Sequence, residues 1–215
     1  ADIITEAGKG VYARGPTGDT SPMWVFNAIS DDFLVSSRLF FKLELMPTRE
    51  TLLHFFEQVR RAYPEMQRFR RRDDGVVVLD EETEGERARR YLRLDGHSLR
   101  FGVFGPTERE SVAAFGEMIL SHSPYHLSLS PLDFDSLEVV YGFDLEFRGN
   151  HDELVADTLL GQSPLHNALL GGGVRIIDCQ PAIGVALNDD LTTQAYVELK
   201  SRTSMHELRT SEFEL

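Results

Sequence analysis

The stretch that decides the fold is RLFFKLELMPTRETLLHFFEQVRRAYP, residues 38–64. In its first half, leucine or phenylalanine stands at every second position from 39 to 45, with Lys42 and Glu44 between them. That alternation predicts a half-buried strand. Pro47 ends the strand, and Thr48 is placed to cap a helix. Apolar residues then recur at helical spacing up to Tyr63, so one face of this helix packs on a core.

Outward from this stretch, turn signals separate four short strands. Asp73-Asp74-Gly75 divides residues 67–72 from 76–79, and Asp95-Gly96 divides residues 89–94 from 98–104. Thr107 and Glu110 form a capping box that predicts the start of a second helix.

The last strand of this region is the clearest, because apolar side chains alternate with polar ones along residues 136–148. Strand, helix, paired strands, helix and strand follow one another over residues 38–148. This order predicts an α+β fold, a ferredoxin-like split β-α-β antiparallel sheet with two helices.

Two further segments flank that unit. Residues 1–37 are rich in turn-forming residues and predict an N-terminal arm with an apolar anchoring segment. Residues 149–215 predict a smaller, related βαββ unit: a helix capped by Asn150, a strand at 174–178, and a hairpin of 183–187 with 191–200. The final residues, 201–215, predict a terminal helix or tail.

Part of the chain resembles a known group of proteins. Arg60-Arg61-Ala62-Tyr63-Pro64 ends the first helix, Arg68-Phe69 opens the next strand, and Val139-Val140-Tyr141-Gly142-Phe143 forms an aromatic-rich strand. Over roughly residues 38–150 this pattern is similar to a sporadically distributed family of uncharacterised bacterial proteins. The resemblance implies a fold and brings no established activity.

The composition argues against several classes of protein. The net charge of −13 disfavours nonspecific binding to nucleic acid, and no apolar run is long enough to span a membrane. Cys179 is the only cysteine and so forms no internal disulfide. We therefore expect a cytoplasmic, bacterial-type protein with no membrane partner.

No motif for catalysis or for a cofactor is present, so we expect a noncatalytic protein with no cofactor and leave an enzyme with scattered site residues open. His122 and His126 have a metal-binding spacing, but Pro124 between them predicts a broken helix and hence no metal site. Cys179 follows a β-branched run, which predicts a buried structural thiol.

Arginine is the strongest functional signal. Residues 60–100 hold half of all Lys and Arg, and each of these eleven residues is an arginine. If Phe69, Leu92 and Leu94 point into the core, the residues between them share the outer face of the sheet. The predicted binding residues are Arg68, Arg70, Arg72, Arg89, Tyr91 and Arg93.

Three uses of this arginine cluster stay open. The favoured one is contact with another protein chain or with a second copy of this chain, in which the acidic C-terminal half takes part and the protein acts as an interaction or regulatory component. Arginine and aromatic residues are enriched at such interfaces and lysine is depleted. An anion site, or a nucleic-acid or nucleotide-binding face, is the alternative. The third is contact with the protein's own C-terminal unit. A charge-paired surface, in which Glu138, Asp144 and Glu146 of the last strand neutralise these arginines, is grouped with the favoured interface.

Overall fold

The computed structural model describes residues 30–82, 89–165, 168, 174–211 and 213. The chain forms two compact units that divide between Asp144 and Leu145, and each is described by itself. The predicted arm at residues 1–29 lies outside the described residues.

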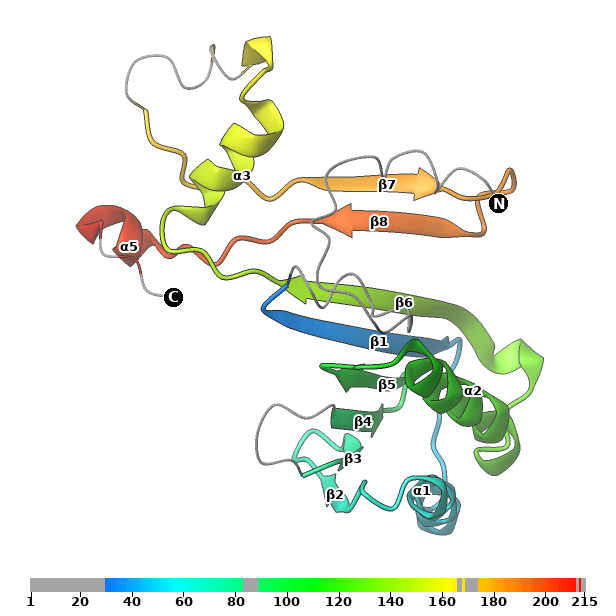
Figure 1. The fold of residues 1–215 in the computed structure, drawn as a ribbon. Helices are drawn as coiled ribbons and strands as arrows, with labels where there is room; N and C mark the ends of the chain where they lie inside the picture. Colours follow the sequence, from blue (N-terminus) through cyan, green and yellow to red (C-terminus); the bar gives the residue numbers. More distant parts are fainter. Residues whose placement is uncertain (1–29, 83–88, 166–167, 169–173, 212, 214–215) are drawn as a thin grey trace, which may run out of the picture. The chain divides into compact units, whose positions relative to one another are not determined.

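The first unit is built on one six-stranded sheet in the order β2-β3-β4-β5-β1-β6 (Figure 1). All neighbouring strands run antiparallel. The strands are β1 (Asp32–Phe41), β2 (Arg68–Arg71), β3 (Val77–Asp80), β4 (Arg89–Leu94), β5 (Ser98–Phe104) and β6 (Phe134–Asp144). The mixed α+β class is thus confirmed, while the ferredoxin-like assignment stays a prediction.

Strand β1 differs most from its predicted span. It begins at Asp32, six residues before the predicted start, because Phe33 and Val35 are buried and continue the alternation upstream. It ends at Phe41, where the register with β6 shifts, and Leu43 is exposed. Residues 32–37, expected in the arm, therefore belong to an interior strand of the sheet, between β5 and β6.

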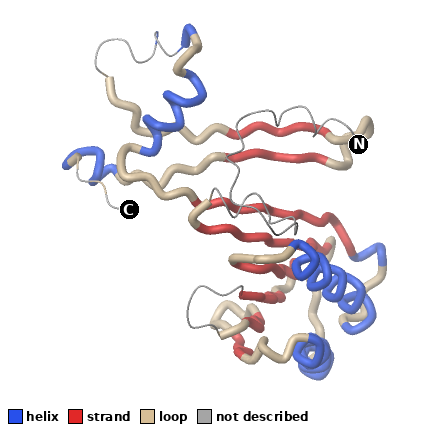
Figure 2. Tube along the Cα trace, viewed as in Figure 1, coloured by secondary structure: helices blue, strands red, loops and turns tan. Residues whose placement is uncertain are grey.

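Two helices lie in the connections between strands, α1 (Arg49–Ala62) and α2 (Arg109–His126) (Figure 2). Thr48 caps α1 as predicted, because its hydroxyl accepts a hydrogen bond from the Thr51 amide at 3.2 Å. The predicted capping box at Thr107 is wrong. Helix α2 begins at Arg109 after Glu108, whose side chain makes no capping bond.

Both helices cover the same face of the sheet. The ring of Phe56 in α1 meets that of Phe69 in β2, and the ring of Phe115 in α2 meets that of Phe101 in β5. Every second residue of the central strands joins this core, including the fully buried Leu79, Leu92 and Leu99. The residues between them point to the opposite side, which we call the open face.

The second unit holds α3 (His151–Leu160), the two-stranded sheet β7 (Ala182–Ala186) and β8 (Gln194–Glu198), and α5 (Met205–Thr210). The predicted strand at 174–178 is wrong, since this segment has no regular structure. The last strand of the first unit, β6, is also shorter than predicted and ends at Asp144 instead of 148. Polar contacts hold this segment in place, as the Asn150 side chain, which caps α3, donates to the Ile176 carbonyl oxygen at 3.0 Å.

Asp152 is the centre of these polar contacts. Its carboxylate accepts hydrogen bonds from the Cys179 amide at 2.8 Å and from the Ser201 hydroxyl at 2.7 Å, and the residue is 1% exposed. One carboxylate thereby joins the start of α3 to two segments distant in sequence. Burial, together with the carboxylates of Asp152 and Asp178, raises the pKa of the half-buried Cys179 thiol.

We expect Asp152→Ala to destabilise the second unit by about 2 kcal/mol, since it removes a buried charged acceptor and leaves two donors without it. Hydrogen exchange of the α3 amides would measure the loss. Asp189→Ala, which removes an exposed carboxylate in the β7–β8 turn, is the control and should leave exchange unchanged. Equal protection in both variants would contradict this role.

Candidate functional site

The candidate site lies on the open face of the sheet, opposite the two helices. The structure places four of the five predicted arginines and Tyr91 on this face. These residues are Arg68, Arg70, Arg89, Tyr91 and Arg93. Arg72 does not join them, since it follows the end of β2 and lies 3.7 Å from Asp74 in the turn.

Two arginines that the sequence analysis did not select complete the site. Arg38 of β1 is the direct cross-strand partner of Arg100 of β5, and Arg100 is the partner of Arg93 of β4. Side chains directly opposite one another in antiparallel strands have Cβ atoms about 5 Å apart. We call Arg38, Arg100 and Arg93 the arginine row.

Some arginines of this face are paired with a carboxylate and others are not. The Asp80 carboxylate binds Arg68 at 2.9 Å and Arg70 at 3.0 Å, so these two arginines are paired. Among the described residues, no carboxylate oxygen lies within 4.0 Å of a guanidinium of the arginine row. Arg38 donates to the Ser98 hydroxyl at 3.0 Å, while the buried Arg93 Nε has no hydrogen-bond partner in the described part of the chain. The row therefore keeps its charge and a free donor.

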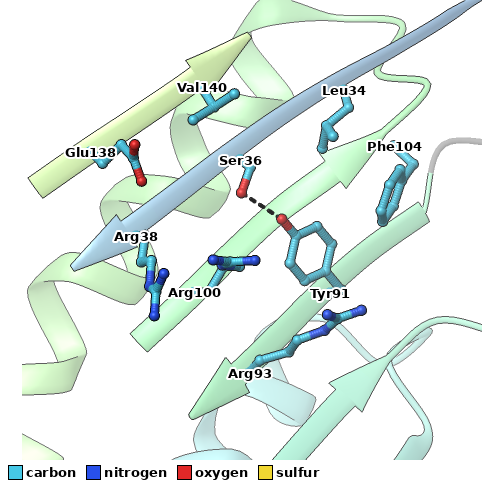
Figure 3. Close-up of a pocket in the computed structure, with 9 residues that line it drawn as sticks. All are labelled: Leu34, Ser36, Arg38, Tyr91, Arg93, Arg100, Phe104, Glu138 and Val140. Carbon is cyan, nitrogen blue, oxygen red and sulfur yellow. Dashed lines mark hydrogen bonds between the residues drawn. The ribbon is translucent and has the colours of Figure 1, made fainter. Parts of the chain in front are cut away.

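A hollow of about 280 Å³ contains this row. Figure 3 shows the three arginines around it, with Tyr91 and Ser36 between the cationic and apolar ends. The hollow is lined by Leu34, Ser36, Arg38, Tyr91, Arg93, Arg100, Phe104, Glu138 and Val140.

Tyr91 forms the floor of the hollow and is only 5% exposed. Its hydroxyl crosses over Gly102 of β5 and donates a 2.6 Å hydrogen bond to the Ser36 hydroxyl, two strands away. Only glycine allows this crossing. A Cβ at position 102 would lie 2.3 Å from the Val35 carbonyl oxygen and 2.9 Å from the Tyr91 hydroxyl.

Guanidinium groups lie over the aromatic rings of this face. Arg93 lies 5.3 Å from the ring centroid of Tyr91, and Arg89 lies 4.7 Å from that of Phe104. Arg38 similarly lies 4.4 Å from the ring centroid of Phe40. These cation–π contacts orient the arginines and cover the rings.

The predicted neutralisation by the last strand is wrong for the predicted arginines. Strand β6 lies at the opposite end of the sheet from β2, with β5 and β1 between it and β4. Glu138 is the cross-strand partner of Arg38 instead, and it is the one carboxylate that lines the hollow. Glu146 lies beyond the end of β6.

The prediction that Pro124 breaks the helix between His122 and His126 is also wrong. Helix α2 continues to His126, because one side of its last turns is buried through Ile119 and Ser123. The ring of His126 lies 4.9 Å from that of His54 in α1 and 5.7 Å from that of His122. Across the part of the chain that the structure describes, no three His, Cys, Asp or Glu side chains are arranged to hold a metal ion.

Comparison with known proteins adds no homologue. No protein-family model matches the chain, and a search of curated proteins gives no match. The resemblance to uncharacterised bacterial proteins therefore stays a prediction. Of the helices within the described ranges, none has the length and apolar character needed to cross a membrane.

Removing one charge from the middle of the arginine row should stabilise the protein. We expect Arg100→Gln to raise the free energy of unfolding by about 0.5 kcal/mol, since like charges on directly opposite residues destabilise a sheet. Thermal unfolding measures the gain, which should shrink as added salt screens the repulsion. Arg71→Gln, at an exposed position of β2 that alternates with Arg70, is the control. A loss of stability, or a gain independent of salt, would count against repulsion within the row.

Acidification should weaken the packing around His126. Burial, followed by the charges of His54 and His122, lowers the pKa of His126 below its ordinary value. The unfolded chain then binds a proton first as the pH falls, so the stability is present above about pH 6.5 and is lost below it. We expect His126→Gln to lose less stability than the wild type between about pH 7 and pH 5 in urea unfolding. Parallel pH curves would disprove this dependence.

Proposed function

We propose that this protein is a noncatalytic interaction component whose arginine row binds an acidic segment of a partner protein. The supporting observation is the row itself: three guanidinium groups in adjacent strands, in one hollow, without an ion pair among the described residues. Arginine presents a planar fork of donors that matches a carboxylate, so an acidic side chain is a suitable ligand.

A protein ligand fits this face better than single-stranded nucleic acid. Sheets that bind single strands stack bases on exposed aromatic rings. Here Tyr91 is 5% exposed and hydrogen-bonded through its hydroxyl, and the rings of Phe40 and Phe104 lie beneath Arg38 and Arg89. The charges of these guanidinium groups remain available, whereas the faces of the rings are occupied.

The C-terminal part of the chain is rich in acidic side chains. Residues 101–215 hold eighteen acidic and six basic side chains. A second copy of the chain could therefore offer the acidic segment, and self-association is one form of the proposed function. Electrostatic attraction between surfaces of opposite charge speeds the association of two protein chains, and added salt weakens it.

The test is binding of a fluorescent Glu-rich peptide and of a single-stranded oligothymidylate of equal length, followed by fluorescence anisotropy. We expect the peptide to bind the wild type, and Arg93→Glu/Arg100→Glu to weaken it by at least about tenfold, since each charged hydrogen bond contributes about 1.5–3 kcal/mol. Arg49→Glu/Arg109→Glu makes the same change in net charge at two exposed helix starts and should bind normally.

Sedimentation of the same variants reports on self-association. Equal peptide affinity in the wild type and in Arg93→Glu/Arg100→Glu would refute the proposal. Tighter, row-dependent binding of the oligothymidylate would replace it with the nucleic-acid alternative.

A further inference from the structure

The charges that line the hollow do not match a single carboxylate. Its walls carry three guanidinium groups and the carboxylate of Glu138, which leaves a net charge of +2. A glutamate or aspartate side chain supplies one negative charge, so half of that excess would persist. A phosphate monoester carries about −1.5 to −2 at pH 7 and would neutralise it.

The number of donors agrees with this charge. The three arginines come from three adjacent strands, which lie about 4.8 Å apart, so their long side chains can reach one central group. Each guanidinium can donate to a different phosphate oxygen, and phosphate offers three such oxygens to the carboxylate's two. Among the described residues, the buried Arg93 Nε has no hydrogen-bond partner.

Apart from Ser36, the remaining walls are mainly apolar. Leu34, Phe104 and Val140 line the hollow together with the ring of Tyr91. Figure 3 places Leu34 and Phe104 at the end away from Arg38. A ligand that fills both ends has a phosphate on a carbon stem, as a phosphorylated side chain does.

We propose that the hollow receives the phosphate monoester of a phosphorylated side chain on the partner protein. This inference rests on the proposed function, since it takes the partner to be a protein and names the group that the arginine row recognises. Among common side-chain modifications, phosphorylation is the one that supplies this charge and these acceptors.

Three small probes separate the contributions of charge and stem: phenyl phosphate, phenylacetate and inorganic phosphate. We would titrate each into the full isotope-labelled chain at low salt and follow amide shifts of β1, β4 and β5. We expect phenyl phosphate to bind at least about tenfold tighter than phenylacetate, because only the former gains the third acceptor and second charge. Inorganic phosphate should bind more weakly than phenyl phosphate, since it leaves the apolar walls uncovered.

Substitutions in the arginine row and changes of pH test whether the row causes the preference for phenyl phosphate. Arg100→Gln should weaken phenyl phosphate by about tenfold and phenylacetate by less, while Arg49→Gln should change neither. Lowering the pH from about 7.5 to about 5.5 should weaken both phosphate probes and leave phenylacetate unchanged, because only the phosphates lose their second negative charge in this range. Apart from the arginines, the titratable groups that line the hollow are Glu138 and Tyr91.

A peptide with phosphotyrosine between alanines tests the protein origin of the phosphate. It should bind at least as tightly as phenyl phosphate, and clearly weaker binding would assign the hollow to a free small phosphate and overturn the inference. Equal affinity for phenyl phosphate and phenylacetate would also overturn it, while row-dependent binding of the Glu-rich peptide would leave the proposed function standing. If neither the probes nor that peptide respond to Arg100→Gln and Arg93→Glu/Arg100→Glu, both proposals fail.

Discussion

Like charges on neighbouring strands repel, yet the register of this sheet sets Arg38, Arg100 and Arg93 directly opposite one another. The opposite face supplies the stability that tolerates this repulsion. Leu92, Leu99 and Phe101 alternate with the arginines along the same strands, and full burial of each such side chain contributes about 1.5–3 kcal/mol. A repelling cross-strand pair costs less than about 1 kcal/mol. The apolar face therefore fixes the register, and the arginine row follows from it.

Local geometry then prepares the row for a ligand. Gly102 lets the Tyr91 ring cross β5 and reach Ser36, which closes the floor of the hollow. The cation–π contact of Arg93 with Tyr91 restricts that guanidinium before any ligand arrives. Side chains that are already ordered lose less conformational entropy on binding. The negative charge of an anion in the hollow also offsets the repulsion among the three arginines.

The sequence predicted the α+β class and the strand faces, because alternation fixes which side chains share a face. It therefore placed Arg68, Arg70, Arg89, Tyr91 and Arg93 together. It did not predict that Asp80 would pair with Arg68 and Arg70, since this depends on the register of β2 against β3.

The same dependence explains why Arg38 and Arg100 were missed. Arg100 alternates with Leu99 and Phe101, so extending the facing argument to β5 would have found it. Arg38 needed the strand order, because β1 becomes a neighbour of β5 only after one helix and three other strands have intervened. The helix through Pro124 likewise depended on burial of the last turns of α2, which local proline chemistry does not reveal.

The most direct test of the arginine row as an anion site compares the melting temperatures of the wild type and Arg100→Gln with and without saturating phenyl phosphate. A ligand that binds the folded state stabilises it in proportion to the logarithm of its concentration over its dissociation constant. We expect Arg100→Gln to melt higher without ligand and the wild type to melt higher with it, so that the order reverses. If phenyl phosphate shifts both proteins equally, or shifts neither, the row is not the anion site.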